Sequence, residues 1–248
     1  MILDIPTQSA GKSPRSRGIP WPTLTKGVLV KRYKRFLADV QLASGEIVTA
    51  HCPNSGSMTG CCEPGRPIYL SWSDNPKRRF RYTWEIIAMP TSLVCVNTGM
   101  ANKLVGRSVV EGLVPELAGY RRLRSEVPCG TSRIDLLLEA EDRPKCFIEI
   151  KSSTMVDDRV ALFPDAVTTR GRKHLVELQA QVRAGNRGVI FFLVQRTDAA
   201  RFRPADSIDP AYGRELRNAC QNGVEILCYD ARLTLRSIAL RGPVPCEL

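Results

Sequence analysis

Three residues of this 248-residue chain have the types and spacing needed for metal-dependent phosphodiester chemistry. Glu149 and Lys151 are two positions apart in an expected β-strand, so both side chains would project from one face. Asp135 lies in the preceding expected strand, and antiparallel pairing would bring it beside Glu149. Two carboxylates can hold Mg²⁺ or Mn²⁺, and a neighbouring ammonium can position water or stabilise developing negative charge. We therefore predict Asp135, Glu149 and Lys151 as catalytic residues.

The acid-x-Lys triplet is weak evidence by itself, because one is expected by chance in a chain of this composition. A solvated strand with a local ion pair is the alternative interpretation. The context favours the metal site, since Ile148 and Ile150 would fill one face of the strand while Glu149 and Lys151 occupy the other. Charges in the centre of a core sheet are costly unless they have a function.

Basic residues predict a nucleic-acid partner. The formal net charge is +11, and residues 21–90 hold ten basic against five acidic side chains. Two runs in this segment interleave cations with aromatic rings, a mixture in which cations neutralise phosphates and rings stack on bases. A solvated strand face is the alternative. The cations that we expect to bind nucleic acid here are Lys31, Arg32, Lys34 and Arg35 in the first run and Lys77, Arg78 and Arg79 in the second.

Short β-rich runs separated by Gly and Asn turns occupy residues 24–88. Five such strands in a short segment predict a small barrel of the oligonucleotide-binding (OB) type, with Trp72 and Trp84 in its core. We expect this domain to span residues 21–90 and a mobile tail to precede it at residues 1–20. The expected strands are residues 28–30, 36–42, 47–50, 68–72 and 82–87.

The pattern changes after residue 90 and predicts a second, α+β domain over residues 91–248. Helical spacing alternates there with continuous apolar runs, in the order α-β-β-β-α-β followed by α-β. The expected helices are residues 102–117, 170–184 and 211–220, and the expected strands are residues 122–127, 133–138, 146–152, 189–194 and 224–229.

Asp135, Glu149-x-Lys151 and the αβββαβ order resemble the PD-(D/E)XK restriction-endonuclease-like fold. Residues 24–240 as a whole resemble the sugar fermentation stimulation protein family. This resemblance implies an N-terminal OB-like barrel, a C-terminal nuclease-like domain, DNA binding and a link to the regulation of sugar (maltose) metabolism. The stretches that carry it are residues 31–40, 51–60, 132–135, 163–168, 170–175 and 223–227.

The resemblance also implies which residues would hold a metal ion. Asp135 and Glu149 match the motif directly. A further glutamate is expected from the first helix, at a position that falls on Arg107 in this chain. Glu111 lies one turn later on the same helical face and is the expected substitute. The non-acidic Arg107 favours a protein that binds without cutting.

Residues around the second expected helix, residues 170–184, could also serve the site. Arg170, Arg172 and Lys173 open this helix and are expected to contact phosphate. His174 is either a proton relay or a hydrogen-bonded structural residue. Asp165 is either an outer-shell ligand or a helix-entry residue, with the second preferred. Residues 54–57 are either a plain turn or a loop that contacts a nucleic-acid backbone.

The sequence thus predicts a DNA-binding protein whose second domain hydrolyses phosphodiesters with Mg²⁺ or Mn²⁺. A binding module that does not cut, or an RNA-directed nuclease, is the alternative. Nine cysteines without a CxxC spacing indicate free thiols in a reducing cytoplasm. No export signal, long apolar span or amphipathic membrane helix is evident, so we expect a cytoplasmic protein without a membrane partner. The oligomeric state stays open, with a homodimer among the alternatives.

Overall fold

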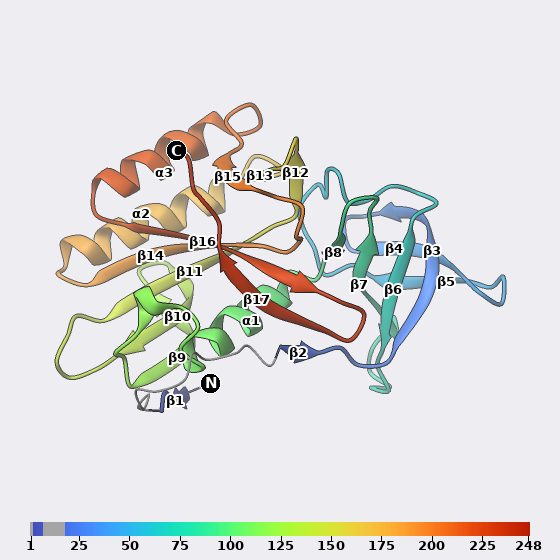
Figure 1. Ribbon diagram of the computed structural model, residues 1–248, viewed down its shortest axis with the longest axis horizontal. Helices are drawn as coiled ribbons and strands as arrows, with labels where there is room; N and C mark the ends of the chain where they lie inside the picture. Colours follow the sequence, from blue (N-terminus) through green and yellow to red (C-terminus); the bar gives the residue numbers. More distant parts are fainter. Residues whose placement is uncertain (1, 7–17) are drawn as a thin grey trace.

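The computed structural model describes residues 2–6 and 18–248. A β-barrel and a larger α+β domain lie side by side along the long axis of the molecule (Figure 1). The barrel strands follow the order β5-β4-β3-β6-β7-β8, and a parallel β5–β7 pairing closes the sheet. The predicted OB-like barrel is therefore confirmed. Its strands are β3 (Leu24–Tyr33), β4 (Leu37–Leu42), β5 (Ile47–His51), β6 (Pro67–Trp72), β7 (Tyr82–Ala88) and β8 (Leu93–Cys95).

Alternating burial along the strands builds the barrel core, as period-2 side-chain direction requires. Trp84 is fully buried there, as predicted. The prediction for Trp72 is wrong, because this residue is the last of β6 and is 49% exposed. It packs edge-on against Tyr82 with ring centroids 4.8 Å apart.

The second domain is built on an eight-stranded sheet with the order β1-β9-β10-β11-β14-β16-β17-β2. Helix α1 packs on one face, and α2 and α3 pack on the other, which gives the sheet two separate apolar cores. The order α1-β9-β10-β11-α2-β14 confirms the predicted αβββαβ arrangement. Its elements are α1 (Gly99–Val110), η1 (Pro115–Leu117), β9 (Arg122–Cys129), β10 (Ser132–Glu139), β11 (Cys146–Ser153), α2 (Thr169–Arg183), β14 (Arg187–Val194), α3 (Pro210–Gln221), β16 (Glu225–Leu233) and β17 (Ser237–Pro243).

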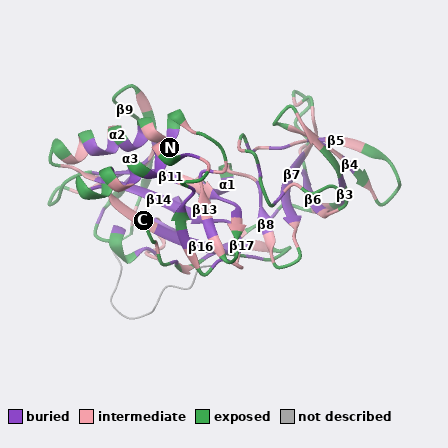
Figure 2. Cartoon of the chain, turned by 90° about the horizontal axis from the view of Figure 1, so that it is seen from above, coloured by how far each residue is buried: buried purple, intermediate pink, exposed green. Residues whose placement is uncertain are grey.

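The local sequence explains the central elements of this domain. β14 is buried along its length because parallel neighbours flank it and helices cover both faces (Figure 2). α2 begins after Thr168, whose hydroxyl accepts a hydrogen bond from Gly171 N at 3.0 Å. A small sheet of β12 (Met155–Asp157), β13 (Val160–Phe163) and β15 (Arg201–Pro204) was not expected from the sequence pattern.

The structure differs from the expected mobile tail over residues 1–20. Residue 1 and residues 7–17 lie outside the described residues. β1 (Ile2–Asp4) pairs with β9, and β2 (Ile19–Pro20) pairs with β17, so the described parts are edge strands of the large sheet. They satisfy backbone groups that an open sheet edge leaves unpaired. β8 also extends the barrel sheet beyond the expected boundary at residue 90.

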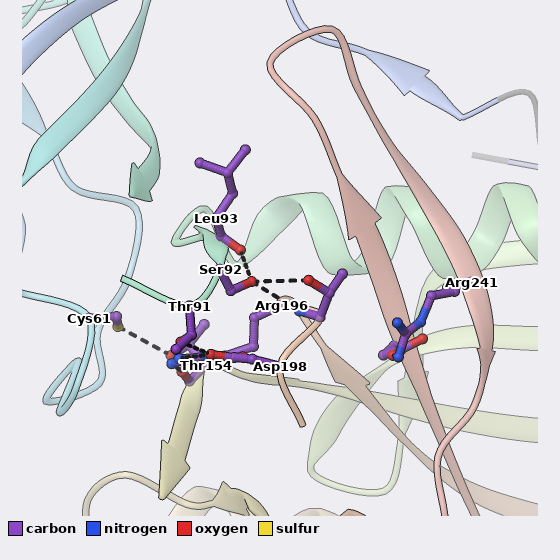
Figure 3. Close-up of polar contacts among 10 residues, drawn as sticks. Cys61, Thr91, Ser92, Leu93, Thr154, Arg196, Asp198 and Arg241 are labelled. Atoms are coloured by element: carbon purple, nitrogen blue, oxygen red, sulfur yellow. Dashed lines mark hydrogen bonds and ion pairs between the residues drawn. The ribbon is translucent and has the colours of Figure 1, made fainter. Parts of the chain in front are cut away.

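A buried polar network fixes the barrel to the second domain (Figure 3). The guanidinium of Arg196 donates two hydrogen bonds to Asp198, both at 2.6 Å, and a third to Thr154 O at 2.9 Å. The Arg196 side chain is only 5% exposed. On the barrel side, Thr91 Oγ1 donates to Asp198 Oδ2, and Cys61 Sγ donates to Thr154 Oγ1 at 3.6 Å. We call these five residues the interdomain clamp.

All nine cysteines are free thiols, as predicted. Burial raises the pKa of the Cys61 thiol to about 12, so this group stays protonated at neutral pH. Within the described part of the chain, none of the helices is both long and apolar enough to span a membrane.

Candidate functional site

A cleft of about 740 Å³ lies between the barrel and the second domain. Residues 54–57 and Arg35 of the barrel line one side, and residues 163–168 with Arg170 line the other. Asp135 and residues 149–152 of the central sheet also line it. The three residues predicted to be catalytic, Asp135, Glu149 and Lys151, therefore line a cavity that both domains form.

The strand register brings Asp135 and Glu149 together. β10 and β11 pair antiparallel with Leu136 opposite Ile148, so the next residues along, Asp135 and Glu149, are neighbours. The backbone N–H of Ile150 donates to Asp135 Oδ2 at 2.7 Å. Lys151 Nζ donates to Glu149 Oε1 at 2.6 Å, which is the same-face geometry that the two-residue spacing predicts.

His174 holds the other side of the Glu149 carboxylate. The side chain of His174 is 3% exposed, and its Nδ1 contacts Glu149 Oε1. Arg170 Nε donates to His174 Nε2 at 3.4 Å. Because Nε2 accepts this bond, Nδ1 carries the proton and donates to the carboxylate. Of the two predicted roles for His174, these contacts favour the hydrogen-bonded structural one.

The two carboxylates titrate in opposite directions. Burial acts to raise the pKa of Glu149, but the hydrogen bonds from His174 and Lys151 outweigh it and hold the pKa below the usual value. Burial and the nearby charge of Glu149 raise the pKa of Asp135 to about 6. Glu149 is therefore charged throughout the neutral range, whereas Asp135 loses its proton only as the pH rises through about 6.

The donor set fits a hard divalent cation. Glu149 Oε2 is buried and has no hydrogen-bond partner within the described part of the chain, so it is free to ligate. Each Asp135 oxygen accepts one hydrogen bond and keeps a second lone pair. An all-oxygen set is preferred by Mg²⁺, Mn²⁺ and Ca²⁺. No group of three Asp, Glu, His or Cys side chains converges among the described residues. The pair therefore suits an ion that takes its other ligands from water and phosphate.

The expectation that Glu111 completes the metal site is corrected by the structure. Glu111 follows the last residue of α1, and its carboxylate pairs with Arg107 Nε at 2.7 Å. The residue of α1 that reaches the site is Asn102, whose Nδ2 donates to Asp135 Oδ1 at 2.7 Å. Nine residues of helix separate Asn102 from Glu111, about 13 Å along the axis. The sequence alone does not single out Asn102, because helical spacing shows which residues share a face and not which end of the helix lies beside Asp135.

The first basic run divides into residues with different roles. The guanidinium of Arg32 donates four hydrogen bonds, at 2.8 to 3.2 Å, to the backbone oxygens of Asn54, Gly56, Ser57 and Arg35. It therefore shapes the loop at the cleft wall, and it also lines the cleft with one N–H donor left over, so its contact with phosphate stays a prediction. The β3–β4 turn holds Lys34 and Arg35 at φ values of 48° and 61°. This strained turn places Arg35 at the cleft.

The other predicted cations lie at varying distances from the cleft. Lys31 is exposed and pairs with Asp39 at 3.5 Å. Lys77, Arg78 and Arg79 lie in the loop between β6 and β7 and do not line the cleft. Of the three cations that open α2, Arg170 lines the cleft, Lys173 lines an adjoining cavity, and Arg172 lines neither.

Asp165 has a function that the sequence did not indicate. Its carboxylate accepts a hydrogen bond from Met58 N at 2.8 Å, and its backbone oxygen accepts one from Ser57 Oγ at 2.5 Å. These bonds join the 163–168 loop to the barrel loop of residues 54–57. Asp165 is therefore an interdomain contact, and neither of its two predicted roles describes this.

We expect Asp135→Asn to stabilise the metal-free protein at pH 7.5 by about 1–3 kcal/mol. The folded-state pKa of Asp135, about 6, lies above the ordinary value of 3.8, so its favourable contribution is complete below 3.8 and is lost as pH rises through 6. The asparagine avoids this loss, and an amide flip of Asn102 keeps the hydrogen bond. Thermal melts of both proteins in EDTA at pH 4 and pH 7.5 would measure the stability difference. An equal difference at the two pH values would contradict the prediction.

The fold and the site define a two-domain protein that joins an OB-type barrel to a nuclease-like domain. A family model described as the sugar fermentation stimulation protein RE domain matches residues 99–237, and one described as the SfsA N-terminal OB domain matches residues 30–96. The chain belongs to the sugar fermentation stimulation protein family.

Full-length relatives agree with this assignment. The sugar fermentation stimulation protein homolog of Geobacter sulfurreducens is 55% identical, over 92% of this chain and 97% of its own. The homolog from Acidithiobacillus ferrooxidans is 52% identical, over 90% and 97%. Among solved structures, Pyrococcus furiosus SfsA in complex with Ca²⁺ superimposes with a TM-score of 0.86 at 27% identity, covering 93% of this chain and 98% of that one.

Proposed function

We propose that this protein binds DNA at the interdomain cleft and hydrolyses phosphodiester bonds there with a bound Mg²⁺ or Mn²⁺. The observation that carries the proposal is the buried, unpartnered Glu149 Oε2 beside Asp135 and Lys151 in a cleft lined by arginines. The Ca²⁺ complex of the Pyrococcus furiosus relative supports a divalent cation.

Each residue has a role that follows from its contacts. Asp135 and Glu149 would hold the ion, which supplies Lewis acidity toward a phosphate oxygen and acidifies water. His174 and Lys151 fix Glu149 Oε1 and so aim Oε2. Arg35 and Arg170 would bind the flanking phosphates. The attacking water would lose a proton to solvent and bond to phosphorus while the bond to the leaving sugar oxygen breaks and that oxygen takes up a proton from solvent. The ammonium of Lys151 would stabilise the negative charge that develops on the phosphate.

A protein that binds DNA without cutting it is the second candidate. The residue of α1 that reaches the site is an amide, Asn102, which favours this candidate because only two carboxylates among the described residues are there to hold an ion. The two functions differ in one measurable property, which is the appearance of new DNA ends in the presence of Mn²⁺.

We expect Lys151→Ala to lower Mn²⁺-dependent DNA cleavage by about 100-fold while DNA affinity changes little, since the lysine acts on charge that develops during reaction. Gel analysis of labelled DNA would measure cleavage, and fluorescence anisotropy would measure binding. Lys103→Ala is the matched control, because Lys103 is an exposed lysine of α1 that does not line the cleft. Wild-type protein that binds DNA but leaves every substrate intact would support the second candidate instead.

A further inference from the structure

The walls of the cleft touch each other, which limits what can enter. Gly56 lies so close to Asp165 that a Cβ on it would be 2.6 Å from both carboxylate oxygens. The bonds from Ser57 and Met58 to Asp165 join the two loops at the same place. A ligand cannot pass between the loops at this point without breaking the contact.

The interdomain clamp opposes any widening of the cleft. The Arg196–Asp198 pair lies within the second domain, and separating the domains would break the bonds that Thr91 and Cys61 on the barrel side make to Asp198 and Thr154. The backbone N–H of Cys95 also donates to Gln195 O at 3.1 Å across the same junction. The cleft is therefore a preformed space whose width these contacts restrain.

The volume of this space matches a single strand better than a duplex. At about 740 Å³ it falls in the range that encloses one drug-sized ligand, which corresponds to about one or two nucleotides. Glu149 is only 3% exposed, so a phosphate must descend to the floor of the cleft to reach it. A strand with unpaired bases is flexible enough to bend into such a space. A duplex is wider and much stiffer, so its phosphates cannot reach the floor of the cleft without bending or unpairing it.

A second cavity of about 530 Å³ lies along the start of α2 and shares one lining residue with the cleft. Arg170 lines both cavities, and His174 lines the second one while contacting Glu149. Arg133 and Lys173 add two further cations, against the single acid Glu126.

These cations keep donors available for a ligand. Lys173 Nζ gives one of its three donors to Thr131 O at 3.2 Å. Arg133 donates to Glu126 O at 2.8 Å through one Nη, and its Nε lies 3.9 Å from the Glu126 carboxylate. Its side chain is 64% exposed, and its other Nη makes no hydrogen bond within the described part of the chain. The Nη atoms of Arg170 make no hydrogen bond within the described part of the chain.

We propose that the substrate is a single strand, either a free strand or an unpaired end, and that the second cavity binds the phosphates next to the one at the carboxylates. This inference rests on the proposed function and specifies its substrate. The strand would run from Arg35 on the barrel, over Asp135 and Glu149, to Arg170, Lys173 and Arg133. The second cavity thus extends the binding track beyond the metal site.

The test measures the affinity of the full chain, in Ca²⁺, for labelled oligothymidylates of about 4 to 16 nucleotides and for blunt duplexes of the same lengths. We expect single strands to bind at least about tenfold tighter than duplexes. Arg133→Ala/Lys173→Ala should weaken long oligomers by about tenfold, leave the shortest unchanged, and reduce the salt slope by about 1.4, or 0.7 for each lost contact. Arg183→Ala is the matched control, an exposed cation at the other end of α2.

The outcomes separate this inference from the function on which it rests. Duplexes that bind as tightly as single strands, or a double variant that matches wild type at every length, would overturn the inference and leave DNA binding intact. Failure to bind any nucleic acid would overturn both. Both substituted side chains are exposed, so folding should be preserved, and a circular dichroism melt would check this.

Discussion

Glu149→Gln should reduce divalent-metal affinity by at least about 100-fold and bring Mn²⁺-dependent cleavage below detection. The amide keeps the size of the side chain but removes its negative charge, and its single oxygen cannot both accept from His174 and Lys151 and ligate from the position of Oε2. Calorimetric titration with Ca²⁺ and Mn²⁺ would measure the affinity. DNA binding in the absence of metal should survive, because the phosphate-binding cations are untouched.

Glu111→Gln is the control for this experiment and should leave metal affinity unchanged. Its carboxylate pairs with Arg107 past the end of α1 and does not line the cleft. A loss of affinity in Glu111→Gln, or full affinity in Glu149→Gln, would show that the ion is held elsewhere. The comparison decides between the ligand set of the sequence analysis and the set that the structure supports.

Asp198→Ala should lower the free energy of unfolding by about 3–5 kcal/mol. This is the largest loss of stability that we expect from replacing a single charged residue of this protein. The change leaves the guanidinium of Arg196, only 5% exposed, without its anionic partner. Burial acts to raise the pKa of Asp198, but the bonds from Arg196 and Thr91 outweigh it and lower the pKa. The contribution is therefore present above the ordinary aspartate pKa and is lost as pH falls through the lowered value.

Asp206→Ala provides the matched control for the clamp. Asp206 makes the same two-bond contact with Arg217, at 2.9 and 2.6 Å, but both side chains are at least 36% exposed. Its loss should cost no more than about 1 kcal/mol, because solvent screens a surface pair. Chemical denaturation of both variants at pH 7 would measure the difference. Equal costs would mean that burial of Arg196 does not determine the strength of the clamp.

Local sequence patterns predicted the elements that carry the chemistry. The two-residue spacing of Glu149 and Lys151 put both side chains on one strand face, and the apolar run of residues 189–194 indicated a strand covered on both sides. The short strands with alternating apolar residues predicted the OB-type barrel. The position of Trp84 in one of these strands predicted that its side chain is buried in the barrel core. These features depend on side-chain direction along a few residues, which backbone geometry sets directly.

Predictions that required distant partners were less successful. Arg32 and Arg35 look alike in the sequence, but only the fold brings the carbonyls of residues 54–57 around Arg32. Trp72 alternates correctly for a core residue, yet β6 ends at this residue and leaves it exposed. The sequence does not show which end of a helix will face a given strand, so Asn102 was missed and Glu111 was preferred.

The sequence by itself determined the nature of the chemistry: two carboxylates and an ammonium on adjacent strands, in a basic protein with a small β-barrel. Only the tertiary structure decided the shape of the space around them. The contacts of Asp165 with the barrel loop, and those of the interdomain clamp, join residues as much as 108 positions apart in the sequence. The width of the cleft depends on those contacts. Local periodicity contains no information about such pairings, because they form only when the two domains pack together.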